Sequence, residues 1–96
     1  MKVTVLRSDG REEEVTLPVE ADDYILPYIY KLIGCDCIDT VRLPQHRQVM
    51  LVDDIGYAKE LPVNTKATAL YHSVCRPGTT APIVGDVVLV REEDFT

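Results

Sequence analysis

Three cysteines and two histidines are the most reactive side chains of this 96-residue chain. Thiolate and imidazole groups ligate soft metals such as zinc, and the candidates for such a site are Cys35, Cys37, Cys75 and His72. Their spacing is not the two-pair spacing of a structural zinc site, and an odd cysteine count fits a reducing compartment. His72 and Cys75 would be neighbours on a helix and could form a nucleophilic pair. The sequence shows no acid that would orient the histidine, so we expect no catalytic residue and no metal here.

The aspartates form a second set that could do chemistry. Carboxylate oxygens suit magnesium or calcium, and four aspartates could converge on one ion: Asp39, Asp53, Asp54 and Asp86. Each lies beside a predicted turn or strand end, where aspartate commonly binds the local backbone, and this is our interpretation. A small metal-dependent hydrolase that uses Asp53 and Asp54 stays an alternative. The chain has no phosphate-binding glycine run, nucleophile elbow or dinucleotide fingerprint, so we expect no cofactor and a protein that is not an enzyme.

The charge balance points toward protein partners. The chain contains ten Lys and Arg residues and sixteen Asp and Glu residues, which gives a formal charge of −6. Proteins that bind a phosphate backbone rely on a basic face, so we expect no direct nucleic-acid binding. Glu12, Glu13 and Glu14 form a continuous acidic run. Such a run can contact a partner, but it can also protect an edge strand against unwanted pairing.

Tyrosine supplies five of the six aromatic residues. Its apolar ring and polar tip suit both the rim of a small core and a protein interface. On the predicted helix, Tyr28 lies near the apolar face, whereas Tyr24 and Tyr30 project toward the sides. The predicted partner-binding residues are therefore Glu12, Glu13, Glu14, Tyr24 and Tyr30.

Short elements must position these side chains, and the first half of the chain predicts a hairpin and a helix. Apolar and polar residues alternate over residues 1–7 and 14–19, on either side of Asp9-Gly10. This pattern is typical of a β-hairpin with a tight turn. Apolar residues at helical spacing then predict a helix over residues 27–33 that ends at Gly34.

The second half repeats this order with different connections. Alternation over residues 37–43 and 48–52 predicts a second hairpin. Asn64 is a good N-cap for a short helix, because its side chain can accept a hydrogen bond from the first turn. A last strand is predicted over residues 83–90, followed by a solvated acidic tail over residues 91–96.

The predicted order is strand, strand, helix, strand, strand, short helix, strand. We expect helices on one side of a largely antiparallel sheet, which is an α+β two-layer domain, with a β-grasp-like start. At 96 residues the chain is long enough for a single domain with one core. No apolar run reaches the roughly 18–20 residues that cross a bilayer, and the N-terminus lacks the pattern of a signal peptide. We therefore expect a cytoplasmic protein with no membrane attachment.

Four short motifs occur in order along the chain: Ile33-Gly34-Cys35, Asp53-Asp54-Ile55-Gly56, Leu61-Pro62-Val63-Asn64 and Gly85-Asp86. With these motifs, about residues 26–90 resemble a small family of domains of unknown function from bacteriophages, prophages and plasmids. Cys35 departs from the family pattern, which has a second glycine there. The matching residues are of turn and cap types, so we interpret them as fold-specifying.

What the resemblance implies is context: a small accessory protein of a phage or mobile element, located in the host cell cytoplasm if phage-encoded. From this we predict a non-enzymatic protein that binds and inhibits a host factor. The inhibited factor would belong to host defence, as for an anti-CRISPR-like protein, and contact would use a tyrosine-containing acidic surface. The alternatives are sequestration of a small nucleotide signal at the interface of a homo-oligomer, and the metal-dependent hydrolase.

Overall fold

The computed structural model describes residues 1–19, 25–75 and 78–95. In these residues a single antiparallel sheet has the strand order β2-β1-β5-β4-β3. Its strands are β1 (Lys2–Leu6), β2 (Glu12–Thr16), β3 (Ile38–Leu43), β4 (Gln48–Asp53) and β5 (Val87–Arg91). The helical segments are α1 (Leu26–Ile33), the 3-10 turn η1 (Pro44–His46), α2 (Thr65–Val74) and the single-turn α3 (Glu92–Phe95). The predicted α+β class is confirmed.

Both predicted hairpins are present. β1 pairs with β2 in a continuous register from Lys2 opposite Thr16 to Leu6 opposite Glu12. The turn between them uses Gly10 at a φ of 97°, a conformation that favours glycine. β3 and β4 form the second hairpin, and η1 lies in the connection between them.

Sheet order follows from the apolar content of the strands. β4 and β5 carry apolar residues at successive positions, and most of their side chains are buried. Strands buried on both faces have this composition, and accordingly β4 and β5 lie inside the sheet while β2 and β3 form its edges.

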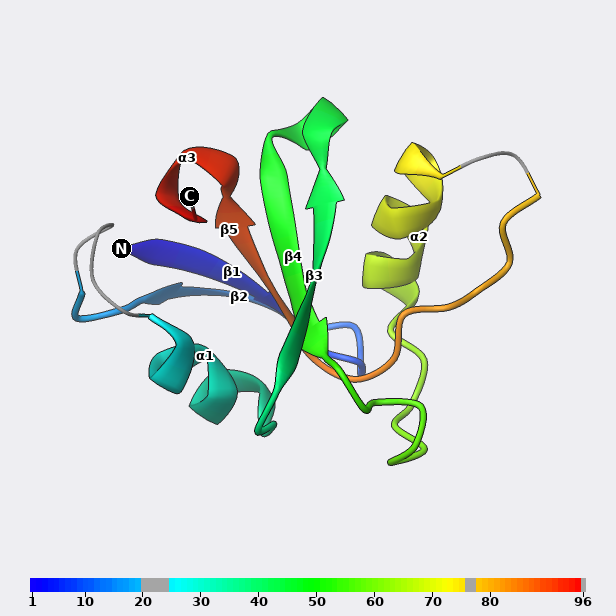
Figure 1. Cartoon of the computed structure of the whole chain (residues 1–96), viewed down its shortest axis with the longest axis horizontal. Coiled ribbons are helices and arrows are strands. Elements are labelled where there is room, and N and C mark those ends of the chain that lie inside the picture. Colours follow the sequence, from blue (N-terminus) through cyan, green and yellow to red (C-terminus); the bar gives the residue numbers. More distant parts are fainter. Residues whose placement is uncertain (20–24, 76–77, 96) are drawn as a thin grey trace.

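The two helices do not share a face of the sheet, contrary to expectation. Figure 1 shows α1 on one side of the sheet and α2 on the other. The reason is the period of two along each strand, which sends alternate side chains to opposite faces. Val49 and Leu51 pack on the α1 side, whereas Met50 and Val52 pack on the α2 side. Each face is apolar enough to need its own cover.

Two cores result, one on each side of the sheet. The α1-side core consists of Val3, Val5, Leu17, Ile25, Ile29, Ile33, Cys35, Val49, Leu51, Val88 and Val90. The α2-side core consists of Leu6, Leu43, Met50, Val52, Ala67, Ile83, Val87 and Leu89.

The helix ends follow the sequence signals in part. α1 ends at Gly34, which has a left-handed φ of 68°, and α2 begins after Asn64, as predicted. The expected tail has regular structure, since Arg91 ends β5 and Glu92–Phe95 form α3, while the side chains of Arg91 and Glu93 are exposed as expected. The Arg91 guanidinium donates to Asp94 at 2.9 Å, which holds this turn against the strand. Within the described ranges, no helix is both long and apolar enough to span a membrane.

Candidate functional site

Exposed large apolar side chains gather in one connection of the described structure. Four such side chains are exposed, and three belong to the 54–63 loop between β4 and α2: Ile55 (51%), Tyr57 (62%) and Val63 (50%). The fourth is Tyr28 on α1, at 36%. Single exposed apolar residues are normal on a protein surface, but three of the four lie in this one connection. The 54–63 loop is therefore the candidate site.

Asp53, the last residue of β4, anchors the start of this loop. Its side chain is only 2% exposed and receives a hydrogen bond from Lys59 Nζ at 2.7 Å. The Ile55 backbone N–H donates to the other carboxylate oxygen at 3.0 Å. The hydrogen bond to Asp53 raises the pKa of Lys59. A buried carboxylate is costly unless it is paired, and these two donors satisfy it while fixing the direction of the loop.

Backbone hydrogen bonds then close the loop on itself. Gly56 N–H donates to Asp53 O at 3.2 Å, and Leu61 N–H donates to Gly56 O at 3.2 Å. Glu60 adopts a left-handed φ of 56° and donates its N–H to Tyr57 O at 3.0 Å. The segment is thus a set of successive turns with internal hydrogen bonds.

Two glycines let the loop lie close to the segment before β5. A Cβ on Gly85 would stand 2.7 Å from Leu61 Cδ1, and one on Gly56 would stand 2.9 Å from Val84 Cγ2. Gly85 also has a φ of 77°, which a side chain would strain. The family-type residues Gly56 and Gly85 therefore permit a tight contact through Leu61.

Further contacts hold the exposed side chains in place. The Tyr57 hydroxyl donates to Pro82 O, and Val63 forms a β-bridge with Val84. Tyr57 and Val63 are consequently positioned by the segment before β5, while much of each side chain stays exposed.

Asn64 fixes the end of the loop and is fully buried. Its Nδ2 donates to Leu6 O at 2.8 Å and to Gly85 O at 2.9 Å. Its Oδ1 accepts from Ala67 N–H at 3.0 Å, which is the predicted N-cap of α2. One side chain therefore connects β1, the approach to β5, and α2.

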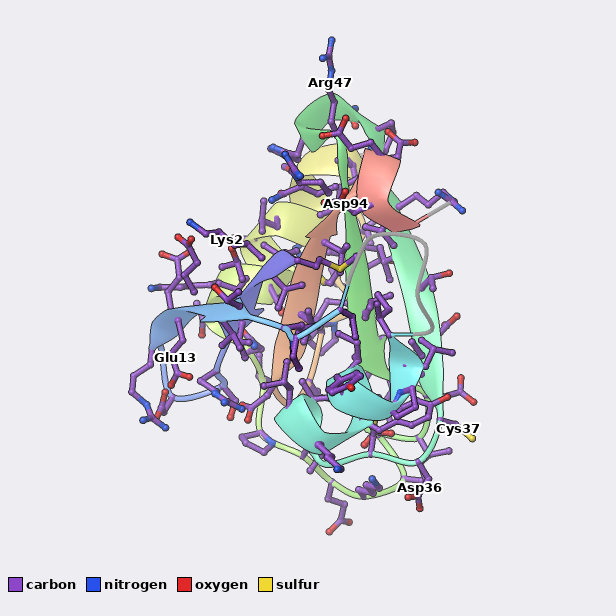
Figure 2. The ribbon with its side chains drawn as sticks, turned by 90° about the vertical axis from the view of Figure 1, so that its left-hand side faces the viewer. Lys2, Glu13, Asp36, Cys37, Arg47 and Asp94 are labelled. Atoms are coloured by element: carbon purple, nitrogen blue, oxygen red, sulfur yellow. The ribbon has the colours of Figure 1, made fainter. Side chains whose placement is uncertain are left out.

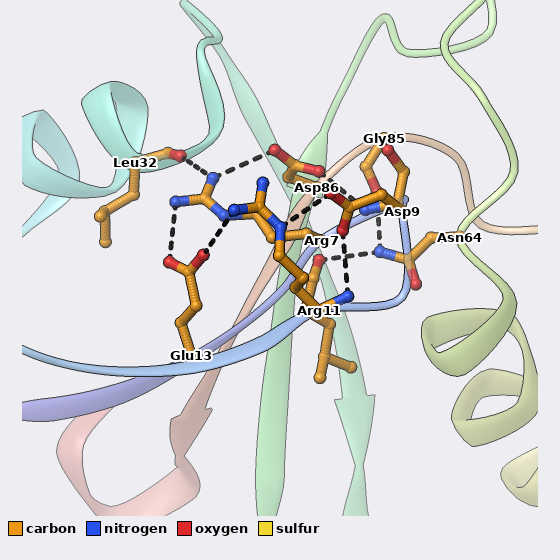
Figure 3. Close-up of polar contacts among 10 residues, drawn as sticks. Arg7, Asp9, Arg11, Glu13, Leu32, Asn64, Gly85 and Asp86 are labelled. Carbon is orange, nitrogen blue, oxygen red and sulfur yellow. Dashed lines mark hydrogen bonds and ion pairs between the residues drawn. The ribbon is translucent and has the colours of Figure 1, made fainter.

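A second polar cluster surrounds Arg7 at the end of the first hairpin (Figure 3). The Arg7 guanidinium donates to Leu32 O at 2.7 Å, to Asp86 at 3.0 Å and to Glu13 at 3.3 Å. Arg11 contacts Glu13 at 3.7 Å and also binds Asp9 at 2.7 Å. The hydrogen bond to Leu32 O attaches the hairpin to the C-terminal end of α1, and the ion pair with Asp86 attaches it to the segment before β5.

The acidic run is split between the two faces of the sheet. Glu13 is half-buried on the α1 side and belongs to the Arg7 cluster. Figure 2 labels Glu13 at the left of the view. Glu12 and Glu14 are exposed on the α2 side, because they lie opposite Leu6 and Thr4. Only Glu12 and Glu14 of the run are therefore open to a partner without displacing Arg7.

The helical pattern alone does not predict how exposed each tyrosine of α1 is. Tyr30 is half-buried and packs against the α1-side core. Tyr28 is exposed, so its predicted place near the apolar face is wrong. Tyr24 lies outside the described residues.

The interpretation that the aspartates bind the local backbone is confirmed for Asp39 and Asp53 and wrong for Asp86, whose partners Ser8 and Arg7 lie on the first hairpin. Asp86 accepts from Ser8 N–H at 2.8 Å as well as from Arg7, and Asp39 accepts from Thr40 N–H at 2.9 Å. Asp53 anchors the 54–63 loop. In the part of the chain that the structure describes, no three His, Cys, Asp or Glu side chains gather as a metal site would require.

The cysteines and histidines are also dispersed. Cys35 is buried in the α1-side core, where burial raises its pKa, and Cys37 is exposed, projecting from the surface in Figure 2. His72 Nε2 lies 2.8 Å from Ala81 O, and His46 Nε2 lies 3.1 Å from Ser73 Oγ.

Sequence reasoning missed Ile55, Tyr57 and Val63. The Asp53-Asp54-Ile55-Gly56 pattern predicted a turn correctly, but a turn motif does not say which of its side chains stay exposed. The available signal was four large apolar residues, Ile55, Tyr57, Leu61 and Val63, in a segment otherwise typical of a loop.

Comparison with known proteins identifies the family of the chain. A family model described as "Domain of unknown function (DUF3846)" matches residues 1–96. Neither the curated proteins nor the solved structures give a significant match. The chain belongs to the DUF3846 family.

Proposed function

We propose that this DUF3846 protein is a non-enzymatic binding protein that docks onto another protein through the 54–63 loop. The observation that carries the proposal is the exposure of Ile55, Tyr57 and Val63 on a segment held at both ends. A few residues carry most of the binding free energy at protein interfaces, and tyrosine is enriched among them.

Rigidity of the loop supports this function. Asp53 and Asn64 hold its two ends, and Leu61 packs against Gly85 in its middle. A surface that is already ordered loses less conformational entropy when a partner binds. The loop is thus a preorganised binding surface.

The charge around the loop indicates the character of the partner. Asp54 and Glu60 are exposed on the loop, whereas Lys59 is engaged with Asp53. Complementary potential steers association, so the partner offers an apolar pocket with basic residues at its rim. The loop is also acidic and contains a tyrosine, but its residues Asp54, Tyr57 and Glu60 differ from the predicted partner-binding residues on the first hairpin and the first helix.

The resemblance to phage and plasmid domains suggests where such a partner is found. We propose that it is a host factor in the cytoplasm, inhibited by this protein in the manner of an anti-defence protein. Inhibition follows if the docked loop covers a surface that the host factor needs.

Quantitative capture from host lysate tests the proposal. The bait is the folded chain, compared with an Ile55→Ser/Val63→Ser variant, and the matched control is Tyr28→Ser on α1. We expect one host protein in stoichiometric amount on the wild type and the control, with about tenfold less on the loop variant. Equal capture by the loop variant, with its circular dichroism unchanged, would overturn the proposal.

A further inference from the structure

Two strands lie at the edges of the sheet, β2 and β3. An edge strand has one row of backbone N–H and C=O groups that no neighbouring strand uses, and such a row can pair with another chain. The two edges of this protein differ in whether those groups are occupied.

Hydrogen bonds at both ends of the β1–β2 ladder show which groups of β2 point outward. Arg7 N–H donates to Arg11 O at 2.8 Å, and Leu17 N–H donates to Met1 O at 2.7 Å, both in the register of the ladder. Hydrogen-bonded pairs alternate along antiparallel strands, so the odd-numbered residues of β2 bond to β1. The outward groups belong to Glu12, Glu14 and Thr16. Within the described residues, no backbone hydrogen bond reaches them from outside the hairpin.

The edge at β3 is treated differently. Asp54 N–H donates to Cys37 O at 3.2 Å, again in register, so Ile38, Thr40 and Arg42 have their backbone groups outward. The central outward donor is already occupied, because Thr40 N–H donates to the Asp39 carboxylate at 2.9 Å. A side chain therefore closes the middle of the β3 edge, whereas no bond among the described residues occupies the outward backbone groups of β2, which is the open edge.

Side chains beside the open edge have a definite pattern. Glu12, Glu14 and Thr16 are exposed on the α2 side. Glu14 has only an exposed ion pair with Lys2 at 3.4 Å, and pairs of this kind contribute little. On the α1 side, Val15 is half-buried against the α1-side core. The edge thus offers two acids on one face and an apolar side chain on the other.

We propose that the open edge of β2 takes up an extended segment of a partner protein as an added antiparallel strand, with basic residues two positions apart. The proposal rests on the proposed function as a binding protein. It adds a second binding surface and the kind of peptide that this surface recognises. Backbone pairing supplies affinity in such complexes, and alternate side chains supply specificity.

The register of the added strand follows from the outward groups. Its residues opposite Glu14 and Glu12 form hydrogen-bonded pairs and place their side chains beside these acids. Lysine or arginine fits there, and an apolar residue fits opposite Val15. The recognised segment, from its N-terminus, is apolar, basic, any residue, basic.

A second copy of this chain does not fit the same edge. In antiparallel pairing of two β2 strands, Glu12 or Glu14 of one copy lies opposite or diagonal to an acid of the other, and like charges across strands are unfavourable. The acidic run therefore opposes self-association and still accepts a basic strand.

A peptide titration followed by ¹⁵N NMR tests the inference. The probe is an acetylated, amidated peptide with the central sequence Thr-Val-Lys-Thr-Lys, and its counterpart carries Glu in place of both Lys residues. We expect saturable shifts and slowed hydrogen exchange at the amides of Glu12, Glu14 and Thr16 with the first peptide only. A Glu12→Lys/Glu14→Lys variant should bind about tenfold more weakly, while Glu93→Lys, an exposed acid on α3, should bind as the wild type does.

N-methylation of the peptide separates strand addition from simple charge attraction. Methylation of the first lysine, whose N–H faces β2, should abolish binding, whereas methylation of the following threonine, whose N–H faces away, should preserve it. Equal binding by both methylated peptides, or shifts without β2 amide protection, would overturn the inference. An Ile55→Ser/Val63→Ser variant should bind the peptide normally, so failure of the loop as an interface and failure of the β2 edge give different results.

Discussion

Replacement of Asn64 by alanine is the change that most directly tests how the 54–63 loop is held. The side chain makes three hydrogen bonds while fully buried: two to the carbonyls of Leu6 and Gly85, and one from Ala67 N–H. Loss of the N-cap costs about 1 kcal/mol, and each buried carbonyl that loses its donor costs about 1 kcal/mol. We therefore expect Asn64→Ala to lower the free energy of unfolding by about 3 kcal/mol.

Urea and thermal denaturation followed by circular dichroism measure this loss. For a domain of this size, about 3 kcal/mol corresponds to a fall in Tm of roughly 15 °C. Thr65→Ala, at the exposed next position, should change the free energy of unfolding by less than about 0.5 kcal/mol. Asn64→Asp keeps the capping oxygen and loses both Nδ2 donors, so it should also destabilise clearly. A loss below about 1 kcal/mol for Asn64→Ala would refute the reasoning, because it would show that the three bonds are not made together.

Three further predictions concern a glycine, the cysteines and a lysine. Gly85→Ala should lower the free energy of unfolding in urea by about 2 kcal/mol, since a φ of 77° strains any side chain and Leu61 occupies the space of a Cβ. An unchanged free energy of unfolding would contradict the close contact between Gly85 and Leu61. In iodoacetamide labelling of the folded protein read by mass spectrometry, Cys37 should react far faster than Cys35, which is buried and has a raised pKa; equal rates would argue against the α1-side core. The raised pKa of Lys59 means that its ion pair stabilises the fold fully below its ordinary pKa of 10.5 and less as pH rises beyond that value. The difference in Tm between wild type and Lys59→Met should therefore shrink above this pH, and a constant difference would exclude the ion pair as its cause.

Local signals in the sequence predicted most elements of the fold. Alternation and the Asp9-Gly10 turn identified the first hairpin, and Asn64 identified the start of α2, because both effects act within a few residues. Gly34 marked the end of α1 for the same reason.

The placement of the helices on opposite faces was not predicted, although a signal existed. β4 and β5 are apolar at successive positions, which is typical of strands covered on both sides. A two-layer fold would leave Met50 and Leu89 facing solvent, whereas α2 and the segment before β5 allow them to be buried.

The candidate site could be predicted only in part. The acidic run was recognised, and the hairpin register divides it into a Glu13 that binds Arg7 and an open Glu12 and Glu14. The further ion pair of Arg7 with Asp86 joins residues far apart in sequence and was not predicted. The exposure of Tyr57 likewise depends on how the loop packs against the segment before β5. Such long-range contacts leave no local pattern in a single sequence.

Hydrogen-exchange mass spectrometry of the complex with a captured host protein tests the central claim most directly. The claim is that this protein acts by binding through the 54–63 loop. We predict that complex formation slows exchange in the 54–63 loop, and along β2 if the partner also adds a strand, while α3 exchanges as in the free protein. Unchanged exchange across the 54–63 loop in a stoichiometric complex would contradict the claim.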